Sequence, residues 1–135
     1  MRIAFDLDDT LICGDPSVPR EATRFRIEPM RAGAPSLWRE LRADGHRVGV
    51  YTSSYRSPVR IRLWLLAFGL RTNFVFTQRD NNHAGIVGKS PRRFGIDCLI
   101  DDDDTACADI HVLPENTGWV DEIRREVETF PPPRR

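Results

Sequence analysis

The chain has 135 residues, of which 40% are hydrophobic and 30% charged, and its formal net charge is zero. This size suits one globular domain, and no apolar run approaches the ~20 residues of a membrane-spanning helix. The neutral balance gives no global argument for a nucleic-acid or acidic-membrane partner. The chain lacks a secretory-signal pattern, and its three cysteines (13, 98 and 107) form no CxxC motif. These features predict a cytoplasmic protein without disulfides or a zinc site.

The first part of the chain predicts two strands, a flap and a helix. A buried strand is expected over 3–7 and a second strand over 47–52, with a helix over 34–43 between them. Residues 12–29 contain several prolines and are expected to form an irregular flap, with 24–27 as one arm of a small hairpin.

The second part continues the alternation of helices and strands. Ser57-Pro58 is a typical helix start, with serine at the cap and proline in the first turn. Trp38 and Trp64 lie at helical spacing with leucines and are expected in the core. The expected elements are a helix to residue 68, a strand over 73–77, a polar loop through 81–83, a short helix over 91–94, strands over 98–100 and 110–113, and a helix over 120–130.

This order predicts an α/β fold. We expect one doubly wound, Rossmann-like domain over 1–130, with a mainly parallel five-stranded sheet and helices on both faces. Residues 131–135 are rich in proline and are expected to form a loose tail.

Acidic residues follow the first strand. Asp6 and Asp8 are two positions apart, so on an extended chain they point to the same side. Two carboxylates so close repel each other unless a cation or a proton lies between them. The carboxyl end of a strand in an open α/β sheet is also where such folds bind ligands.

Other polar groups are expected at the same sheet edge. Thr52 and Ser53 follow the second strand, and Asp101 and Asp102 follow the fourth. Lys89, the only lysine of an arginine-rich chain, comes shortly before that strand and suits a role that needs a compact ammonium. Acids for a divalent cation, with a hydroxyl and an ammonium for a phosphoryl group, favour phosphoryl transfer.

In this order the motifs resemble those of the haloacid dehalogenase (HAD) superfamily. They are the DxDxT sequence at 6–10, an apolar strand ending in Thr52, the upstream Lys89, and the acidic pair 101–102 after an apolar strand. The resemblance implies a phosphomonoester hydrolase that acts through an aspartyl-phosphate. Two alternatives stay open: a phosphatase for nucleic-acid ends, and a non-catalytic domain that binds phosphate.

The resemblance also implies roles for the acidic residues. Asp6 would be the nucleophile, and Asp8 the general acid and then the general base. Mg²⁺ would be held by the Asp6 carboxylate, the Asp8 backbone carbonyl and Asp101, with Asp102 as the further acid. Asp103 and Asp104 compete with Asp102 for that role.

The remaining implied roles concern the substrate. Thr52, with Ser53, would hydrogen-bond a phosphoryl oxygen, and Lys89 would neutralise the nucleophile. Arg56, just beyond this loop, is the favoured substrate-binding arginine. The segments 10–52 and 52–89 are too short for a cap domain. We therefore expect an open site that admits a large phosphorylated substrate, in a monomer or a homo-oligomer whose second subunit serves as the lid.

Overall fold

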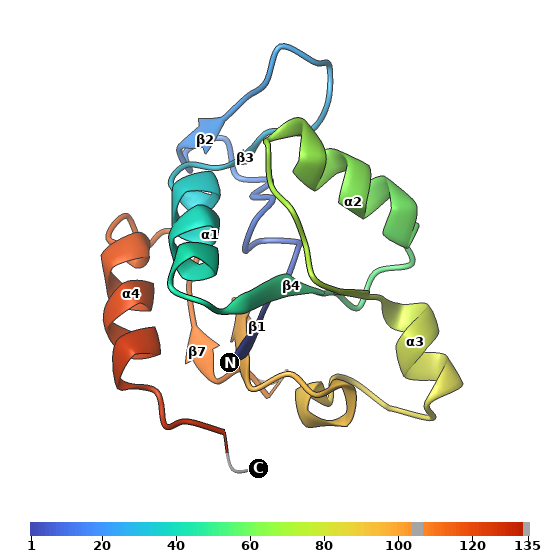
Figure 1. Ribbon diagram of the computed structural model, residues 1–135. Coiled ribbons are helices and arrows are strands. Elements are labelled where there is room, and N and C mark those ends of the chain that lie inside the picture. The colour runs from blue at the N-terminus through green and yellow to red at the C-terminus, as the bar shows by residue number, and fades with distance from the viewer. Residues whose placement is uncertain (104–106, 134–135) are drawn as a thin grey trace.

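The core of the fold is a five-stranded parallel sheet. The computed structural model (Figure 1) describes residues 1–103 and 107–133. The strand order is β5-β4-β1-β6-β7, and all neighbouring strands run parallel. The predicted doubly wound α/β sheet is therefore confirmed. The strands are β1 (Arg2–Phe5), β4 (Arg47–Tyr51), β5 (Val75–Phe76), β6 (Cys98–Asp101) and β7 (Ile110–His111).

Helices cover both faces of this sheet (Figure 1). The long helices α1 (Ala34–Ala43), α2 (Pro58–Ala67) and α4 (Trp119–Thr129) contribute to the main hydrophobic core. The short α3 (Gln78–His83) and the 3₁₀ helix η1 (Pro91–Phe94) lie on the other face. Within the described residues, neither the segment 10–52 nor the segment 52–89 contains a separate cap domain. None of the described helices is long and apolar enough to cross a membrane.

The order of the strands determines where a ligand site can form. From β1 the chain moves outward through β4 to β5, and then returns across the sheet to β6 on the other side of β1. In a parallel sheet, such a reversal opens a crevice at the carboxyl ends of the two central strands. Here these strands are β1 and β6.

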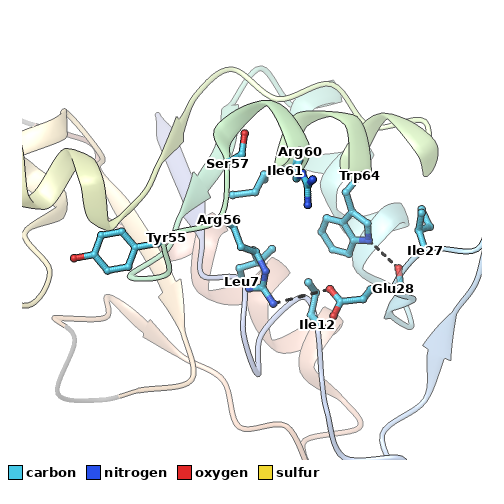
Figure 2. Close-up of a pocket in the computed structure, with 10 residues that line it drawn as sticks. All are labelled: Leu7, Ile12, Ile27, Glu28, Tyr55, Arg56, Ser57, Arg60, Ile61 and Trp64. Atoms are coloured by element: carbon cyan, nitrogen blue, oxygen red, sulfur yellow. Dashed lines mark hydrogen bonds and ion pairs between the residues drawn. The ribbon is translucent and has the colours of Figure 1, made fainter.

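The flap is a hairpin whose arms differ from the prediction. Its strands are β2 (Arg20–Glu21) and β3 (Met30–Arg31), whereas residues 24–27 form bends between them. The two strands pair at the base of the flap, where both residues of β3 are buried. Beyond the base the segment lies against α2, where the Trp64 indole donates to the Glu28 carbonyl at 2.8 Å (Figure 2).

The polar loop predicted at 81–83 is wrong, because these residues belong to α3. The helix begins after Thr77, whose backbone amide donates to the Asp80 carboxylate at 2.8 Å. The spacing of these two residues is that of a capping box, a sequence signal that the prediction overlooked. Asn81 is fully buried, so this polar segment packs inward.

Several other boundaries shift by a few residues. β5 and β7 are shorter than predicted, at two residues each. β7 ends early because Pro114 has no amide to donate and the Leu113 carbonyl accepts from Arg31 instead. α1 has the predicted bounds, and α2 and α4 differ by about a residue at each end. Ser57 is the N-cap of α2, but its hydroxyl makes no capping hydrogen bond.

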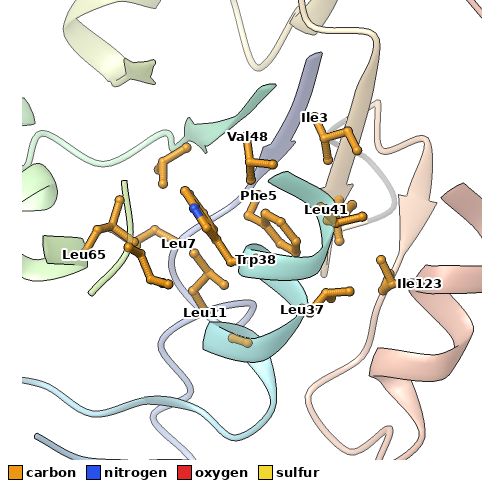
Figure 3. Close-up of a cluster of buried hydrophobic side chains, with 14 of the residues drawn as sticks. Ile3, Phe5, Leu7, Leu11, Leu37, Trp38, Leu41, Val48, Leu65 and Ile123 are labelled. Atoms are coloured by element: carbon orange, nitrogen blue, oxygen red, sulfur yellow. The ribbon is translucent and has the colours of Figure 1, made fainter. Parts of the chain in front are cut away.

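The main core lies between the sheet and the long helices (Figure 3). Trp38 is fully buried, stacks on Phe5 with 5.6 Å between ring centroids, and donates to the Arg71 carbonyl. Its predicted place in the core is confirmed. Trp64 is only partly buried at the edge of the core, because α2 turns Ile61 and Leu65 toward the sheet instead.

Candidate functional site

Polar residues from three strands meet at the carboxyl end of the sheet. Asp6 follows β1, and its amide donates to the Ile100 carbonyl of β6 at 2.9 Å. Asp101 is the last residue of β6. A cavity of about 320 Å³ opens here. Its lining includes Asp6, Asp8, Ser53, Lys89, Asp101 and Asp102.

Lys89 joins the first and fourth motifs directly. Its Nζ lies 2.9 Å from Asp6 Oδ1 and 2.7 Å from Asp101 Oδ2, and it donates to the Tyr51 carbonyl at 3.2 Å. The three charged side chains are almost fully buried, with exposed fractions of 5% for Lys89, 10% for Asp6 and 1% for Asp101. Burial alone lowers the pKa of Lys89, but the two carboxylates outweigh it and raise the pKa above its usual value.

The acids of the site carry more charge than one lysine balances. Burial raises the pKa of Asp6 to about 8; Lys89 opposes this shift and Asp101 adds to it. Burial, followed by the neighbouring Asp101, also raises the pKa of Asp102. When all three carboxyl groups are ionised, the one ammonium leaves an excess of negative charge, which a bound cation would neutralise.

The donor set fits a hard divalent cation. Asp6, Asp101 and Asp102 each offer a carboxylate oxygen, and these oxygens lie within 4.8 Å of one another. Mg²⁺ prefers oxygen ligands, and it usually binds a few carboxylates together with substrate phosphate and water. Asp103 also lines the cavity, and its amide donates to Asp101 Oδ1 at 3.1 Å. Asp104, the third residue proposed for this acidic role, lies outside the described residues.

Asp8 is held apart from this group. β1 ends at Phe5, so the predicted strand over 3–7 is too long and Asp8 lies beyond it, although Asp6 and Asp8 line one cavity as expected. The amides of Leu11 and Ile12 donate to the Leu7 carbonyl, which closes a tight turn after the strand. Asp8 on this turn still lines the cavity, but its side chain is 52% exposed.

Arg56 is the partner of the Asp8 carboxylate. Its Nη1 lies 2.8 Å from both oxygens of Asp8, and its Nη2 lies 4.0 Å from Glu28 on the flap. From its place in the sequence, Arg56 is expected to bind the substrate. The structure places it beside the expected proton donor, and its contact with substrate stays a prediction.

The two hydroxyl groups after β4 differ in position. Thr52 is buried, and its Oγ1 accepts from the Ser54 amide at 3.1 Å and contacts the Ser54 hydroxyl at 3.2 Å. Ser53 is exposed and lines the cavity with Lys89. Their predicted contacts with a phosphoryl oxygen are not tested by this geometry.

Sequence reasoning missed a second row of residues behind Lys89. The Tyr51 hydroxyl accepts from the Ser90 amide at 3.0 Å and donates to Asn81 Oδ1 at 2.5 Å. Tyr51 and Asn81 are fully buried. The Tyr51 carbonyl also accepts a hydrogen bond from Lys89. Tyr51 therefore holds both Lys89 and the next residue, Ser90, in place. The sequence feature that could have indicated this network is Tyr51, which stands immediately before Thr52 at the end of the predicted strand.

Comparisons of the chain with protein-family models, with curated proteins and with solved structures found no match. A buried carboxylate paired with a lysine, two nearby acids and a separate exposed carboxylate offer a nucleophile, a cation site and a proton carrier.

Proposed function

We propose that this chain is a Mg²⁺-dependent phosphomonoester hydrolase of the HAD type, acting through an aspartyl-phosphate. The observation that carries the proposal is the Lys89 ammonium between Asp6 and Asp101. These contacts join residues 83 and 12 positions apart in the chain, in the combination that the four motifs imply. Asp102 completes a group of acids that fits the cation.

The first half-reaction transfers the phosphoryl group to the protein. A carboxylate oxygen of Asp6 forms a bond to phosphorus while the bond from phosphorus to the ester oxygen breaks. The protonated Asp8 carboxyl gives its proton to the leaving alcohol oxygen. Lys89 opposes protonation of the Asp6 carboxyl and offsets charge on the phosphoryl oxygens.

The second half-reaction returns the protein to its starting state. Asp8, now ionised, takes a proton from water, whose oxygen attacks phosphorus and breaks its bond to Asp6. Inorganic phosphate leaves. Asp6, Asp101 and Asp102 would hold Mg²⁺, which when bound supplies Lewis-acid stabilisation of the phosphoryl oxygens.

Substitution of neighbouring aspartates tests the proposal. With p-nitrophenyl phosphate and Mg²⁺, we expect Asp6→Asn to abolish turnover and Asp8→Asn to lower it about 10²–10⁴-fold. Asp9→Asn is the matched control, because Asp9 directly follows Asp8 and lines the same cavity but has no proposed part in catalysis or cation binding, and its φ of 61° is tolerated by asparagine. It should retain turnover within about threefold.

Two outcomes would overturn the proposal. Activity that survives Asp6→Asn excludes the covalent route. Absence of turnover in every protein, with phosphate still bound by wild type, favours the non-catalytic alternative. Trapping of labelled phosphate on Asp6 in the Asp8→Asn protein measures the intermediate directly.

The cellular setting belongs to the same proposal. Cys13, Cys98 and Cys107 are all free thiols. This supports a reducing compartment such as the cytoplasm, where thiols are kept reduced. Mass spectrometry of the protein from non-reducing extracts would detect a disulfide and so contradict this location.

A further inference from the structure

A groove along α2 begins beside the candidate site, where Arg56 of its wall contacts Asp8. Its inner part is a hollow of about 550 Å³, with Ile61 and Trp64 of α2 on one side and Ile12 and Ile27 on the other (Figure 2). It continues into an outer hollow of about 530 Å³, which shares Ile27 and Trp64 with the inner one.

Much of the surface beside the groove is apolar and exposed. In the part of the chain that the structure describes, six of the eight exposed large hydrophobic side chains belong to the flap or to the segment 55–66. They are Phe25, Ile27, Tyr55, Val59, Leu63 and Leu66. All of them except Val59 line one of the two hollows. An apolar surface gathered in this way marks a binding site, because exposing it to water is unfavourable.

The sequence of α2 explains this surface. Its mean hydropathy is positive, and only Ile61 and Leu65 are buried against the core. Leu63 and Leu66 project away from the sheet and are about 60% exposed. By contrast, α4 buries Ile123 and carries charged residues on its outer side. The apolar outer side of α2 is therefore not needed for the packing of the sheet.

The inner end of the groove identifies its occupant. Arg56 belongs to the inner hollow and also holds the carboxylate of Asp8. Leu7, which precedes Asp8 in the turn, forms part of the same wall. The oxygen that Asp8 protonates must lie at this end, so the group attached to that oxygen extends into the groove.

Charge supports the same orientation. The acidic cavity repels a phosphate dianion until a cation binds, whereas the inner hollow carries two arginines, Arg56 and Arg60, against the one carboxylate of Glu28 and attracts it. The outer hollow is lined almost entirely by apolar side chains, with Arg60 as its charged residue. A molecule with an anionic head and an apolar body fits these two surfaces, the charged inner hollow and the apolar outer one.

We propose that the groove binds the leaving group of the substrate, and that the preferred substrates are phosphate monoesters of long or bulky apolar alcohols. This proposal rests on the proposed phosphatase function and names its substrate class. A protein partner or a second copy of the chain on the same surface is an alternative outcome of the test.

Ethyl phosphate and octyl phosphate test the proposal, because both release primary alcohols of nearly equal acidity. Release of inorganic phosphate is measured with Mg²⁺, below the concentration at which octyl phosphate forms micelles. We expect kcat/KM to be at least about 30-fold higher for octyl phosphate, since each buried methylene favours binding. Leu63→Gln and Ile27→Gln should each lower this ratio about fivefold to tenfold.

Leu113→Gln is the matched control, because Leu113 is also an exposed apolar residue but lies outside the groove. It should leave the octyl-to-ethyl ratio unchanged. Equal kcat/KM for the two esters in wild type would overturn the groove assignment and leave the phosphatase function standing. A wild-type dimer that Leu63→Gln dissociates, with the ratio unaffected, would overturn it in favour of a second copy.

A binding measurement separates this proposal from the phosphatase function. Trp64 lies in the groove, so binding of either ester to the Asp6→Asn protein can be followed by tryptophan fluorescence and calorimetry. If no ester is hydrolysed, tighter binding of octyl than of ethyl phosphate, weakened by Leu63→Gln, still supports the groove. Equal or absent binding of the two esters overturns it.

Discussion

Asp6 and Asp8, which both follow β1, lie in opposite environments. Asp6 is paired with Lys89 inside the protein, and the exposed fractions of these side chains are 10% and 5%. Asp8 is paired with Arg56 at the surface, with exposed fractions of 52% and 36%. Both acids line the same cavity. One turn of chain therefore separates a buried ion pair from a solvated one.

This difference suits the two roles proposed for the acids. Removing one partner of a buried pair leaves an uncompensated charge, so the Asp6 pair is held in one arrangement. An exposed pair contributes little to stability, so the Asp8 carboxyl can exchange Arg56 for a substrate oxygen or water at small cost. A nucleophile benefits from a fixed position, and a proton carrier from freedom to change partners.

Loss of the lysine should have the largest effect. We expect Lys89→Met to lower kcat about 10³-fold or more, because the acids of the cavity then lack their ammonium. Lys89→Arg should recover little, since a planar guanidinium does not fit where Nζ contacts Asp6, Asp101 and the Tyr51 carbonyl together. Turnover of p-nitrophenyl phosphate measures the effect, with circular dichroism as the control for folding. Near-normal kcat in either variant would contradict the proposed difference between the buried Asp6–Lys89 pair and the exposed Asp8–Arg56 pair.

The network behind the lysine should have a smaller effect. Tyr51→Phe keeps the buried ring but removes the hydroxyl between Ser90 and Asn81. We expect kcat to fall about tenfold with KM little changed, because the substitution loosens Lys89 rather than a substrate contact. A rise in KM alone would contradict this positioning role, and the thermal midpoint of each protein controls for a general loss of stability.

The fold was largely predictable from the sequence, since it depends on local patterns. Apolar strands alternate with amphipathic segments, and capping residues and glycines separate them. The prediction failed where tertiary contacts override local preference. The polar α3 packs Asn81 inward, and the flap pairs at β3 because Met30 and Arg31 are buried there. Neither burial is visible in the sequence.

The site was predictable as a set of residues but not as a set of contacts. The order of the motifs correctly predicted that Asp6, Lys89 and Asp101 lie together, since the strands of a doubly wound sheet end at one edge. Sequence spacing did not reveal that Asp8 leaves the strand and binds Arg56. That pair depends on the tight turn closed on Leu7, which places residues 48 positions apart in contact.

Mg²⁺ should stabilise the protein, and more so at higher pH. Burial raises the pKa of Asp6 to about 8, whereas in the unfolded chain the carboxyl titrates near its usual value of about 4. The folded state therefore binds a proton here more tightly, and the metal-free protein loses stability as pH rises from about 4 to 8. Because Mg²⁺ replaces that proton, it should raise the thermal midpoint by several degrees at about pH 8 and much less at about pH 5.

Calorimetry of wild type and Asp102→Asn checks this expectation. The substitution removes one of the three carboxylates that fit the cation, so the stabilisation by Mg²⁺ should fall. An equal rise of the thermal midpoint at both pH values would show that the cation does not compete with protons in this cavity. It would then bind elsewhere on the protein.

The smallest effect is expected at Arg56. Arg56→Gln removes the partner of Asp8 without changing the buried pair, so we expect hydrolysis of an alkyl phosphate to fall only about threefold to fivefold. p-Nitrophenyl phosphate should be affected less, because its leaving group needs little protonation, and Arg56→Lys should be intermediate. If Arg56→Gln costs as much as Asp8→Asn with both esters, the exposed pair acts as a fixed unit. Asp8 would then be positioned by Arg56 as firmly as Asp6 is by Lys89, and the surface pair would differ from the buried one in solvent contact alone.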